Sequence, residues 1–327
     1  MPLPAVTVVI PNYNGAQLLQ KNIPSVLAAM QQYEGDTTLV VVDDGSTDNS
    51  LQILKQAFPQ AKVVVHTHNQ GFADAIHSGV NAADTELLFL LNSDVAVSSH
   101  LLAPLVSYFD DPNTFAVNPL IYDERGEVKR HSWNLRQLKR GTLKLLNWKL
   151  ETALKLATEG ELLPTLYAHG GSFLVRKSRF LQLGGFHPIY KPFYSEDYDL
   201  GIRAWRMGWP SYFEPRVHIV HQSIGAIRSE TKFSYIKSIR RRNRYILEWV
   251  HFETKQLLMF VLPASILQLM GECLTLNRVN LRGFYLAVMK LPEVMALRRT
   301  QKQAVFSLND VLAKIKIVLD KAANKAL

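Results

Sequence analysis

The sequence predicts an α/β fold in which helices cover both faces of a mostly parallel sheet. Short, nearly continuous apolar runs recur between residues 6 and 91. Helical stretches of about ten residues or more separate them, and a polar cluster follows the end of most runs. Continuous apolar strands that alternate with helices are typical of parallel sheets buried on both faces.

The expected elements alternate in order along the chain. We expect strands over residues 6–11, 38–42, 61–66 and 86–91, and helices over residues 18–32, 50–58 and 72–83. The polar clusters PNYNG, DDGSTD and NSD follow three of these strands. Ligands of such sheets bind at the carboxyl ends of the strands, so the three clusters should meet in space.

Charge divides the chain into two parts. Residues 1–227, which we take as one folded domain, carry a net charge of −2, whereas residues 228–327 carry +11. The second part reads as a basic, partly apolar helical tail. Such a tail indicates an anionic partner, either a membrane surface or a phosphate-bearing acceptor, or else a solvated face. Nucleic acid is not expected, because no aromatic residues are interleaved with the charges as a stacking platform requires.

Two segments stand apart from the alternating pattern. Residues 129–163 combine eight Lys and Arg residues with many leucines and Trp148, which predicts a basic amphipathic helical insertion. It could serve as a lid, as a membrane contact or as a packed helix with a solvated face. Residues 256–276 form the most apolar window, interrupted by Pro263 and Glu272. We expect a helix pair or an interfacial helix there rather than a membrane span.

The overall composition is that of a globular protein, with 47% hydrophobic and 20% charged residues. The single cysteine, Cys273, permits no internal disulfide and fits a reducing compartment. The first residues, MPLPAVTVVI, lack the basic segment and the long apolar stretch of a secretion signal. These features favour a cytoplasmic location.

The residues at the strand ends match the needs of a nucleotide-sugar site. Tyr13 offers a ring for stacking on a base, and Asp43 and Asp44 offer acceptors for a base N–H or a ribose hydroxyl. Gly71 lets the backbone approach a ligand closely. Asn92 and Asp94 offer hard oxygen ligands of the kind that Mg²⁺ or Mn²⁺ prefers. Each residue also has a structural interpretation as a turn former or helix cap.

Five blocks of sequence carry a resemblance to a known family. They are VTVVIPNYNG, LVVVDDGSTDNS, NQGFADAIHSGVNAA, LLFLLNSDV and the long block that runs from HGGSFLVRKSRF to YSEDYDLGIRAWRMGW. In this order they resemble the family 2 glycosyltransferases, inverting enzymes with a Rossmann-like GT-A fold, and especially the rhamnosyltransferase-like bacterial members. The resemblance covers residues 5–225.

On the donor side, the resemblance implies specific roles. Pro11 and Tyr13 would line the base pocket, and Asp44, with Asp43 alongside, would bind the base or ribose. Asn92 and Asp94 occupy the family's metal-binding motif. Asn92 stands where relatives often have Asp, so Asp94 is left as the charged ligand of a divalent metal.

On the acceptor side, the resemblance places the general base in SEDYDL. An inverting transfer needs one carboxylate beside the acceptor hydroxyl. We assign Asp197 first and Glu196 second, although both would also stabilise the start of a helix. The resemblance adds His221 as a metal ligand, and His218 should point to the opposite side of the strand.

Three further residues are assigned to the acceptor side of the site. They are Gly170 and Gly171 in the HGG segment, together with Trp205. Helical packing is the alternative interpretation of Trp205, because Ala204 and Met207 surround it.

The predicted function is an inverting, metal-dependent glycosyl transfer. The donor would be a UDP- or dTDP-sugar, and the acceptor a hydroxyl of a glycan or lipid-linked molecule in cell-surface polysaccharide synthesis. The basic tail favours peripheral contact with an anionic membrane on its cytoplasmic face. The alternative is a non-catalytic nucleotide-sugar binding or scaffold protein on the same fold.

Overall fold

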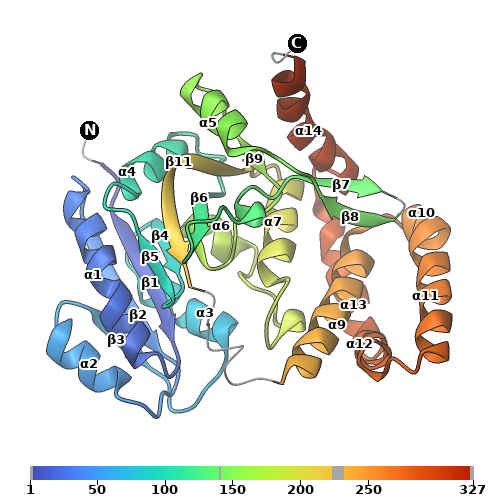
Figure 1. Ribbon diagram of the computed structural model, residues 1–327, viewed down its shortest axis with the longest axis horizontal. Coiled ribbons are helices and arrows are strands. Elements are labelled where there is room, and N and C mark those ends of the chain that lie inside the picture. The colour runs from blue at the N-terminus through green and yellow to red at the C-terminus, as the bar shows by residue number, and fades with distance from the viewer. Residues whose placement is uncertain (1–2, 140, 223–231, 325–327) are drawn as a thin grey trace.

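A computed structural model describes residues 3–139, 141–222 and 232–324 and has a nine-stranded sheet at its centre (Figure 1). The strands are β1 (Val6–Asn12), β2 (Thr37–Asp43), β3 (Lys62–Val65), β4 (Leu87–Leu91), β5 (Val95–Val97), β6 (Ala116–Asp123), β9 (Pro164–Thr165), β10 (Ser172–Arg176) and β11 (Ser211–His221). Their order is β3-β2-β1-β4-β10-β6-β11-β5, and β9 pairs with β11.

The sheet is mostly parallel, as the sequence predicts. β1 pairs in parallel with β2 and β4, β2 with β3, and β6 with β11. β10 runs antiparallel between β4 and β6, so the carboxyl ends of β1, β2, β4, β6 and β11 lie at one edge of the sheet. The polar residues that follow these strands therefore share that edge.

Helices cover both faces of the sheet (Figure 1). They are α1 (Ala16–Gln32), α2 (Ser50–Ala57), α3 (Phe72–Ala82), α4 (Leu102–Val106), α6 (Lys177–Gln182) and α7 (Glu196–Arg206), with short 3₁₀ turns η1 (Ser107–Asp110) and η3 (Pro188–Tyr190). Val8 of β1 packs with Leu19 and Ile23 of α1, whereas Val9 packs with Ile76 of α3. Successive strand residues point to opposite faces, which is why the central strands β1, β2 and β4 are apolar over most of their length.

The expected helical insertion over residues 129–163 is wrong in its first half. This segment forms a 3₁₀ turn η2 (Arg130–Ser132), a hairpin of β7 (Arg136–Lys139) and β8 (Thr142–Leu145), and only then a helix, α5 (Leu150–Thr158). The hairpin turns at Gly141, whose φ of +73° favours glycine. Cross-strand pairing of partly buried leucines, Leu138 with Leu143, replaces the expected helical stripe.

The tail is helical, as the sequence predicts. It contains α9 (Phe233–His251), α10 (Thr254–Gln256), the π-turn η4 (Leu257–Val261), α11 (Leu262–Leu274), α12 (Arg278–Val288), α13 (Leu291–Thr300), η5 (Gln301–Gln303) and α14 (Leu308–Asn324). The predicted boundary at residues 227–228 lies outside the described residues. Ile246 and Val250 of α9 and Val311 of α14 join a core cluster with Ile202 of α7, so the tail packs directly on the domain.

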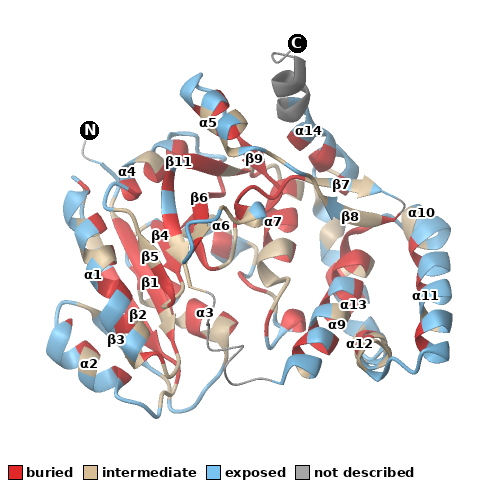
Figure 2. Ribbon diagram, in the orientation of Figure 1, coloured by how far each residue is buried: buried red, intermediate tan, exposed pale blue. Residues whose placement is uncertain are grey.

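The apolar window over residues 256–276 lies in one continuous helical run rather than a helix pair. Thr254–Leu274 is long and apolar enough to cross a membrane by length and composition, and little of it is buried. Figure 2 shows most of α11 as exposed. Val261 is an exception and joins the core cluster of the tail.

Candidate active site

The end of β2 carries the most tightly held acids of the donor side. Asp43 is fully buried, and its Oδ1 accepts a hydrogen bond from the Ser46 backbone N–H at 3.0 Å. Its Oδ2 accepts from Nδ2 of Asn12, the last residue of β1, at 3.1 Å. Asp43 therefore joins the β1 and β2 loops, and sequence reasoning missed Asn12 as its partner.

Asp44 organises the loop that leads into α3. Its Oδ1 lies 2.6 Å from His66 Nδ1 and accepts from the Gln70 N–H at 2.9 Å, while Oδ2 accepts from the Gly71 N–H at 2.8 Å. Gly71 has a φ of +94°, which only glycine adopts readily. A carboxylate offers about four acceptor positions, so one remains for a ligand.

Pro11 and Tyr13 lie at the end of β1 and just beyond it, both half-buried. The loop after them is fixed by Asn14, whose Oδ1 accepts from the Thr47 N–H at 2.8 Å. Gly15 then allows the chain to pass close to Asn12, because a Cβ atom there would lie 2.3 Å from Asn12 Oδ1. The predicted base-pocket residues thus sit beside Asp43.

The end of β4 presents polar atoms without partners. Within the described residues, Asp94 Oδ1 and Asn92 Oδ1 are buried and have no hydrogen-bond partner. His221 ends β11, and its Nε2 lies 3.5 Å from Asp94 Oδ1. His218 is exposed on the same strand and contacts the ring of Tyr122 instead. Of the two histidines, His221 is therefore the one that lies next to Asp94.

These atoms fit a divalent cation. Buried oxygens without partners are unfavourable unless a ligand satisfies them, and burial raises the pKa of Asp94 although His221 opposes the shift. Across the described chain, no group of three His, Cys, Asp or Glu side chains could hold a metal ion by itself. Mg²⁺ is commonly held by one or two carboxylates together with substrate phosphates, and this donor set is of that kind.

Glu196 and Asp197 begin α7 and differ in their contacts. Asp197 Oδ2 accepts from the Gly170 N–H at 2.9 Å, and its Oδ1 accepts from the Tyr198 N–H at 2.8 Å. Glu196 Oε2 is buried and, among the residues that the structure describes, lacks a partner. Burial and the adjacent charge of Asp197 raise the pKa of Glu196. Burial also raises the pKa of Asp197, while the Gly170 and Tyr198 N–H groups lower it. The hydrogen bonds favour Asp197 as the ionised member.

A histidine and two glycines connect the predicted metal and base residues. The Asn92 N–H donates to the Gly171 carbonyl at 2.9 Å, and a Cβ on Gly171 would lie 3.0 Å from Asn92 Nδ2. The rings of His169 and His221 meet edge to face, with centroids 6.0 Å apart. The Gly170 N–H donates to Asp197, and the carbonyl of the next residue, Gly171, accepts from the Asn92 N–H. These two hydrogen bonds bring the strand-end residues and the acids Glu196 and Asp197 together.

Trp205 lies in the core rather than beside Glu196 and Asp197. Its indole N–H donates to the Thr165 carbonyl at 2.8 Å, and the ring is almost fully buried. The packing interpretation therefore holds for Trp205.

Other aromatic rings lie beside the base. Tyr167 and Tyr198 stack with centroids 4.4 Å apart, and the Arg136 guanidinium lies 5.2 Å from the Tyr198 ring centre. Arg136 belongs to β7, so this contact comes from the β7–β8 hairpin, where the sequence predicted a helix.

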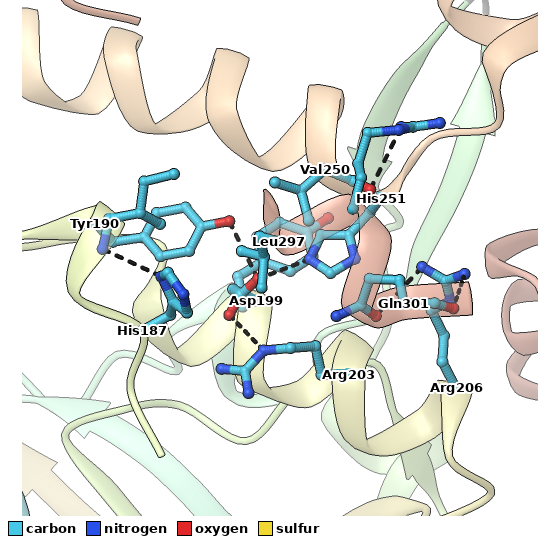
Figure 3. Close-up of polar contacts among 12 residues, drawn as sticks. His187, Tyr190, Asp199, Arg203, Arg206, Val250, His251, Leu297 and Gln301 are labelled. Carbon is cyan, nitrogen blue, oxygen red and sulfur yellow. Dashed lines mark hydrogen bonds and ion pairs between the residues drawn. The ribbon is translucent and has the colours of Figure 1, made fainter. Parts of the chain in front are cut away.

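A buried network lies behind α7 (Figure 3). Asp199 accepts from Arg203 Nε at 2.7 Å and from the Tyr190 hydroxyl at 3.1 Å, and it lies 2.8 Å from His251 Nε2 of α9. Burial alone would raise the pKa of Asp199, but Arg203 and His251 together lower it below its usual range. Burial lowers the pKa of His251. The network joins α7, the helix that begins with Glu196 and Asp197, to α9 of the tail.

The loop that precedes Glu196 and Asp197 is also held by side chains of the tail. Tyr194 and Ser195 both have left-handed backbone, with φ of 72° and 75°, which is costly for residues other than glycine. Asn243 Nδ2 donates to the carbonyls of Tyr190, Phe193 and Tyr194 at 2.9, 2.9 and 2.7 Å. Arg242 donates to the carbonyls of Tyr190 and Lys191.

Sequence reasoning missed Asn243, although a signal existed. It falls at helical spacing on the apolar stripe formed by Ile236, Ile239, Ile246 and Val250. A polar residue on a buried stripe must be satisfied by hydrogen bonds, which is the role that Asn243 has here.

Polar residues gather at the carboxyl ends of the parallel strands, which is where α/β sheets of this kind bind their ligands. The family model "Glycosyl transferase family 2" matches residues 7–182, more than half of the chain. The chain belongs to this family.

Curated relatives are glycosyltransferases as well. The chain is 26% identical over 241 residues to the N-acetylglucosaminyl-diphospho-decaprenol L-rhamnosyltransferase of Mycobacterium tuberculosis, which covers 68% of this chain and 75% of the relative. It is 37% identical over 115 residues to an uncharacterised glycosyltransferase of Nostoc sp., covering 34% of this chain. The match spans only 35% of that relative's length.

Solved structures share the fold. A mannosyltransferase from Pyrobaculum calidifontis, in complex with GDP-Man and Mn²⁺, has a TM-score of 0.54 at 17% identity and covers 99% of this chain and 87% of that one. GalNAc-T7 with UDP, GalNAc and Mn²⁺ has a TM-score of 0.59 at 20% identity and covers 77% of this chain and 49% of that one. At these identities the likeness shows the GT-A fold.

Proposed function

We propose that the protein transfers a sugar, with inversion, from a UDP- or dTDP-sugar to a hydroxyl of a lipid-linked or glycan acceptor. The observation that carries this proposal is the meeting of two different acidic sites. Asp94 lies 3.5 Å from His221. Asp197 accepts from the Gly170 N–H, and the neighbouring Gly171 carbonyl accepts from the Asn92 N–H beside Asp94. A diphosphate site beside a held carboxylate is what a one-step displacement needs.

The donor side would be bound by residues of three strand ends. Tyr13 would stack on the base, and the free acceptor position of Asp44 would take a base N–H or a ribose hydroxyl. Asp94 and His221, with Asn92, would hold a divalent cation. When bound, this cation would offset the charge of the leaving diphosphate.

The reaction would take place between the donor and the loop that carries Asp197. The acceptor oxygen forms a bond to the anomeric carbon while the bond from that carbon to the diphosphate oxygen breaks. The acceptor proton passes to one oxygen of Asp197, while Oδ2 keeps its hydrogen bond from the Gly170 N–H and Oδ1 keeps its bond from the Tyr198 N–H. Those two hydrogen bonds hold the carboxylate in place during the transfer.

The acceptor class is proposed from the relatives. The mycobacterial enzyme is named for a decaprenol-diphosphate-linked sugar, and a minor teichoic acid biosynthesis protein of Bacillus subtilis is 30% identical over 123 residues. We therefore propose a polyprenyl-diphosphate-linked sugar as acceptor. Such an acceptor and a nucleotide-sugar meet at the cytoplasmic face of the membrane, which is the proposed location.

Thermal unfolding with nucleotides tests the donor site. Purified protein would be heated with UDP, dTDP or GDP, with and without Mn²⁺. A ligand at about 100 times its Kd adds roughly 2.7 kcal/mol to stability. We expect a rise with one nucleotide that depends on Mn²⁺ and is lost in Asp94→Ala. The matched control is Asp84→Ala, because Asp84 is an exposed aspartate on the surface.

A second measurement separates the transferase from a non-catalytic binding protein. The transferase would release nucleoside diphosphate from the sugar nucleotide in the presence of the lipid-linked acceptor, whereas a scaffold would bind the donor without consuming it. Binding without any turnover, with acceptor present, would support the scaffold alternative. A stability rise that ignores Mn²⁺ would remove the cation from the proposal.

A further inference from the structure

A basic groove lies between α9 and α12 of the tail, and none of the candidate metal or base residues lines it. Lys237, Arg240, Arg241 and Arg244 of α9 line one side, and Asn277 and Asn280 line the other. Its volume of about 450 Å³ is within the usual range for ligand sites, roughly 300–1,000 Å³.

The groove has more cations than acids. Arg244 pairs with Glu248 at 2.9 Å, and Arg241 pairs with Glu272 at 3.0 Å. The Lys237 ammonium lies over the Phe233 ring and the Arg240 guanidinium over the Tyr194 ring. No carboxylate of the described residues forms an ion pair with either cation. The groove therefore keeps a positive charge that would attract an anion.

An exposed apolar helix borders this groove. Nine large apolar side chains from Leu258 to Leu276 are exposed, with Leu267, Leu274 and Leu276 at 70%, 86% and 76%. A continuous apolar surface of this extent usually marks an interaction site in a soluble protein. Glu272 joins the two features, because it accepts from Arg241 of α9 and from Asn280 of α12.

The helical run Thr254–Leu274 is tied to the protein at both ends. At the first end, Arg298 donates to Thr254 Oγ1 at 3.3 Å, and Gln256 donates to Asn309 at 3.0 Å. At the other end, Glu272 holds Arg241. A helix held at both ends by other helices of the tail lies along the surface of the tail, so in this fold its ends are not placed on opposite sides of a bilayer.

The charges decide what covers the apolar face. Between residues 254 and 290 the sequence has four basic residues and a single acid, Glu272, which is buried. A symmetric dimer through this face would bring the basic groups of two copies together. An anionic bilayer offers both an apolar layer and negative headgroups at the same surface.

We propose that the groove of α9 and α12 and the exposed face of Thr254–Leu274 form one docking surface for an anionic lipid bilayer. The apolar side chains enter the headgroup boundary, and Lys237 and Arg240 contact lipid phosphates. This docking goes beyond the glycosyl transfer proposed above, and its test uses no donor, metal or acceptor, so either can fail alone.

Vesicle flotation of the full chain tests the docking. The probes are vesicles of phosphatidylcholine alone and vesicles in which part of it is replaced by phosphatidylglycerol. We expect binding to the anionic vesicles, weaker at high salt. Each cation near such a surface contributes about fivefold in affinity, so Lys237→Glu with Arg240→Glu should weaken binding by roughly 25-fold or more. Leu267→Asp with Leu274→Asp should weaken it about tenfold or more.

Matched controls place the same changes elsewhere. Lys21→Glu with Lys55→Glu reverses two exposed charges on α1 and α2, and Leu51→Asp with Leu162→Asp changes two exposed leucines away from the tail. These variants should float like the unmodified chain. The proposal is overturned if the chain ignores both kinds of vesicle, if it binds neutral vesicles equally, or if the tail variants bind as well as the controls. It is also overturned if light scattering shows a dimer that the leucine variants dissociate.

Discussion

Buried carboxylates at the two ends of the site are satisfied in opposite ways. On the donor side, Asp43 and Asp44 each accept hydrogen bonds on both oxygens, and these bonds shape the loops after β2. Asp94 and Glu196 each keep a buried oxygen that accepts no hydrogen bond within the described residues, although His221 Nε2 lies 3.5 Å from the Asp94 oxygen. Burial raises the pKa of both acids. The contacts of the first pair favour a structural role, whereas the buried oxygens of the second pair are costly to the fold and are the ones proposed above for metal binding and catalysis.

Asp197 stands between these extremes and should show the largest effect. Its oxygens accept one backbone N–H each, which leaves lone pairs for a proton. We expect Asp197→Asn to lower kcat by about 10²–10⁴, the usual loss of a general base, with donor affinity unchanged. Steady-state kinetics and nucleotide titration measure the two quantities. A fully active Asp197→Asn beside an inactive Glu196→Gln would reverse the two roles.

Stability measurements test the comparison directly. Asp44→Ala leaves two backbone N–H groups and His66 without their acceptor, so we expect a loss of about 2–4 kcal/mol of unfolding free energy. Asp94→Ala removes an acid that has no hydrogen-bond partner for its buried oxygen, so the metal-free protein should lose little or gain stability. Urea unfolding in the presence of a chelator measures both. Equal losses in the two variants would break the distinction between them.

The contacts of Asn243 should have a smaller effect on stability and a distinct effect on catalysis. Asn243→Ala removes three hydrogen bonds to the loop before the base, and we expect a loss of about 1–3 kcal/mol together with a lower kcat. Asn309→Ala, at an exposed asparagine on α14, is the matched control. The prediction fails if Asn243→Ala lowers stability but leaves kcat unchanged under conditions where the protein is fully folded.

The pH dependence of the rate should show the smallest effect. Burial raises the pKa of Asp197 even though two N–H groups lower it. A general base must be ionised, so the rate falls as pH falls through this pKa. The acidic limb of kcat/KM should therefore lie above the value for an ordinary aspartate, about 3.9. A limb at or below that value would mean that the hydrogen bonds outweigh burial.

The sequence predicts the donor half well and the acceptor half incompletely. The strands up to β4 are continuous apolar runs with caps and turns nearby, so each is set by local pattern. The hairpin of β7 and β8 is too short for its alternation to stand out, and its lysines and leucines are also common in helices. The contacts of Asn243 reach carbonyls 49 to 53 residues earlier, which no local pattern can display.

The proposed metal and base residues could be singled out from the sequence, because they lie at a strand end or a helix start and match the family's motifs. Their supporting residues were harder to find. His251 and Arg242 belong to a basic amphipathic helix whose charges favour an interpretation as a solvated or lipid-facing surface. Only the fold shows that Arg242 points inward to the loop carbonyls while Arg240 borders the groove.

The helix α9 has different tasks on its two sides. One side holds the loop before α7 through Asn243 and α7 itself through His251, and the other side borders the basic groove. A helix is only about 10–12 Å across and its backbone is hydrogen-bonded along its length, so the two sides move together as one rigid element. In a docked chain, α9 would therefore fix the distance between Asp197 and the membrane surface. Asp197 would stand at one height above the headgroups, and acceptors would be sorted by how far their hydroxyl extends from the bilayer.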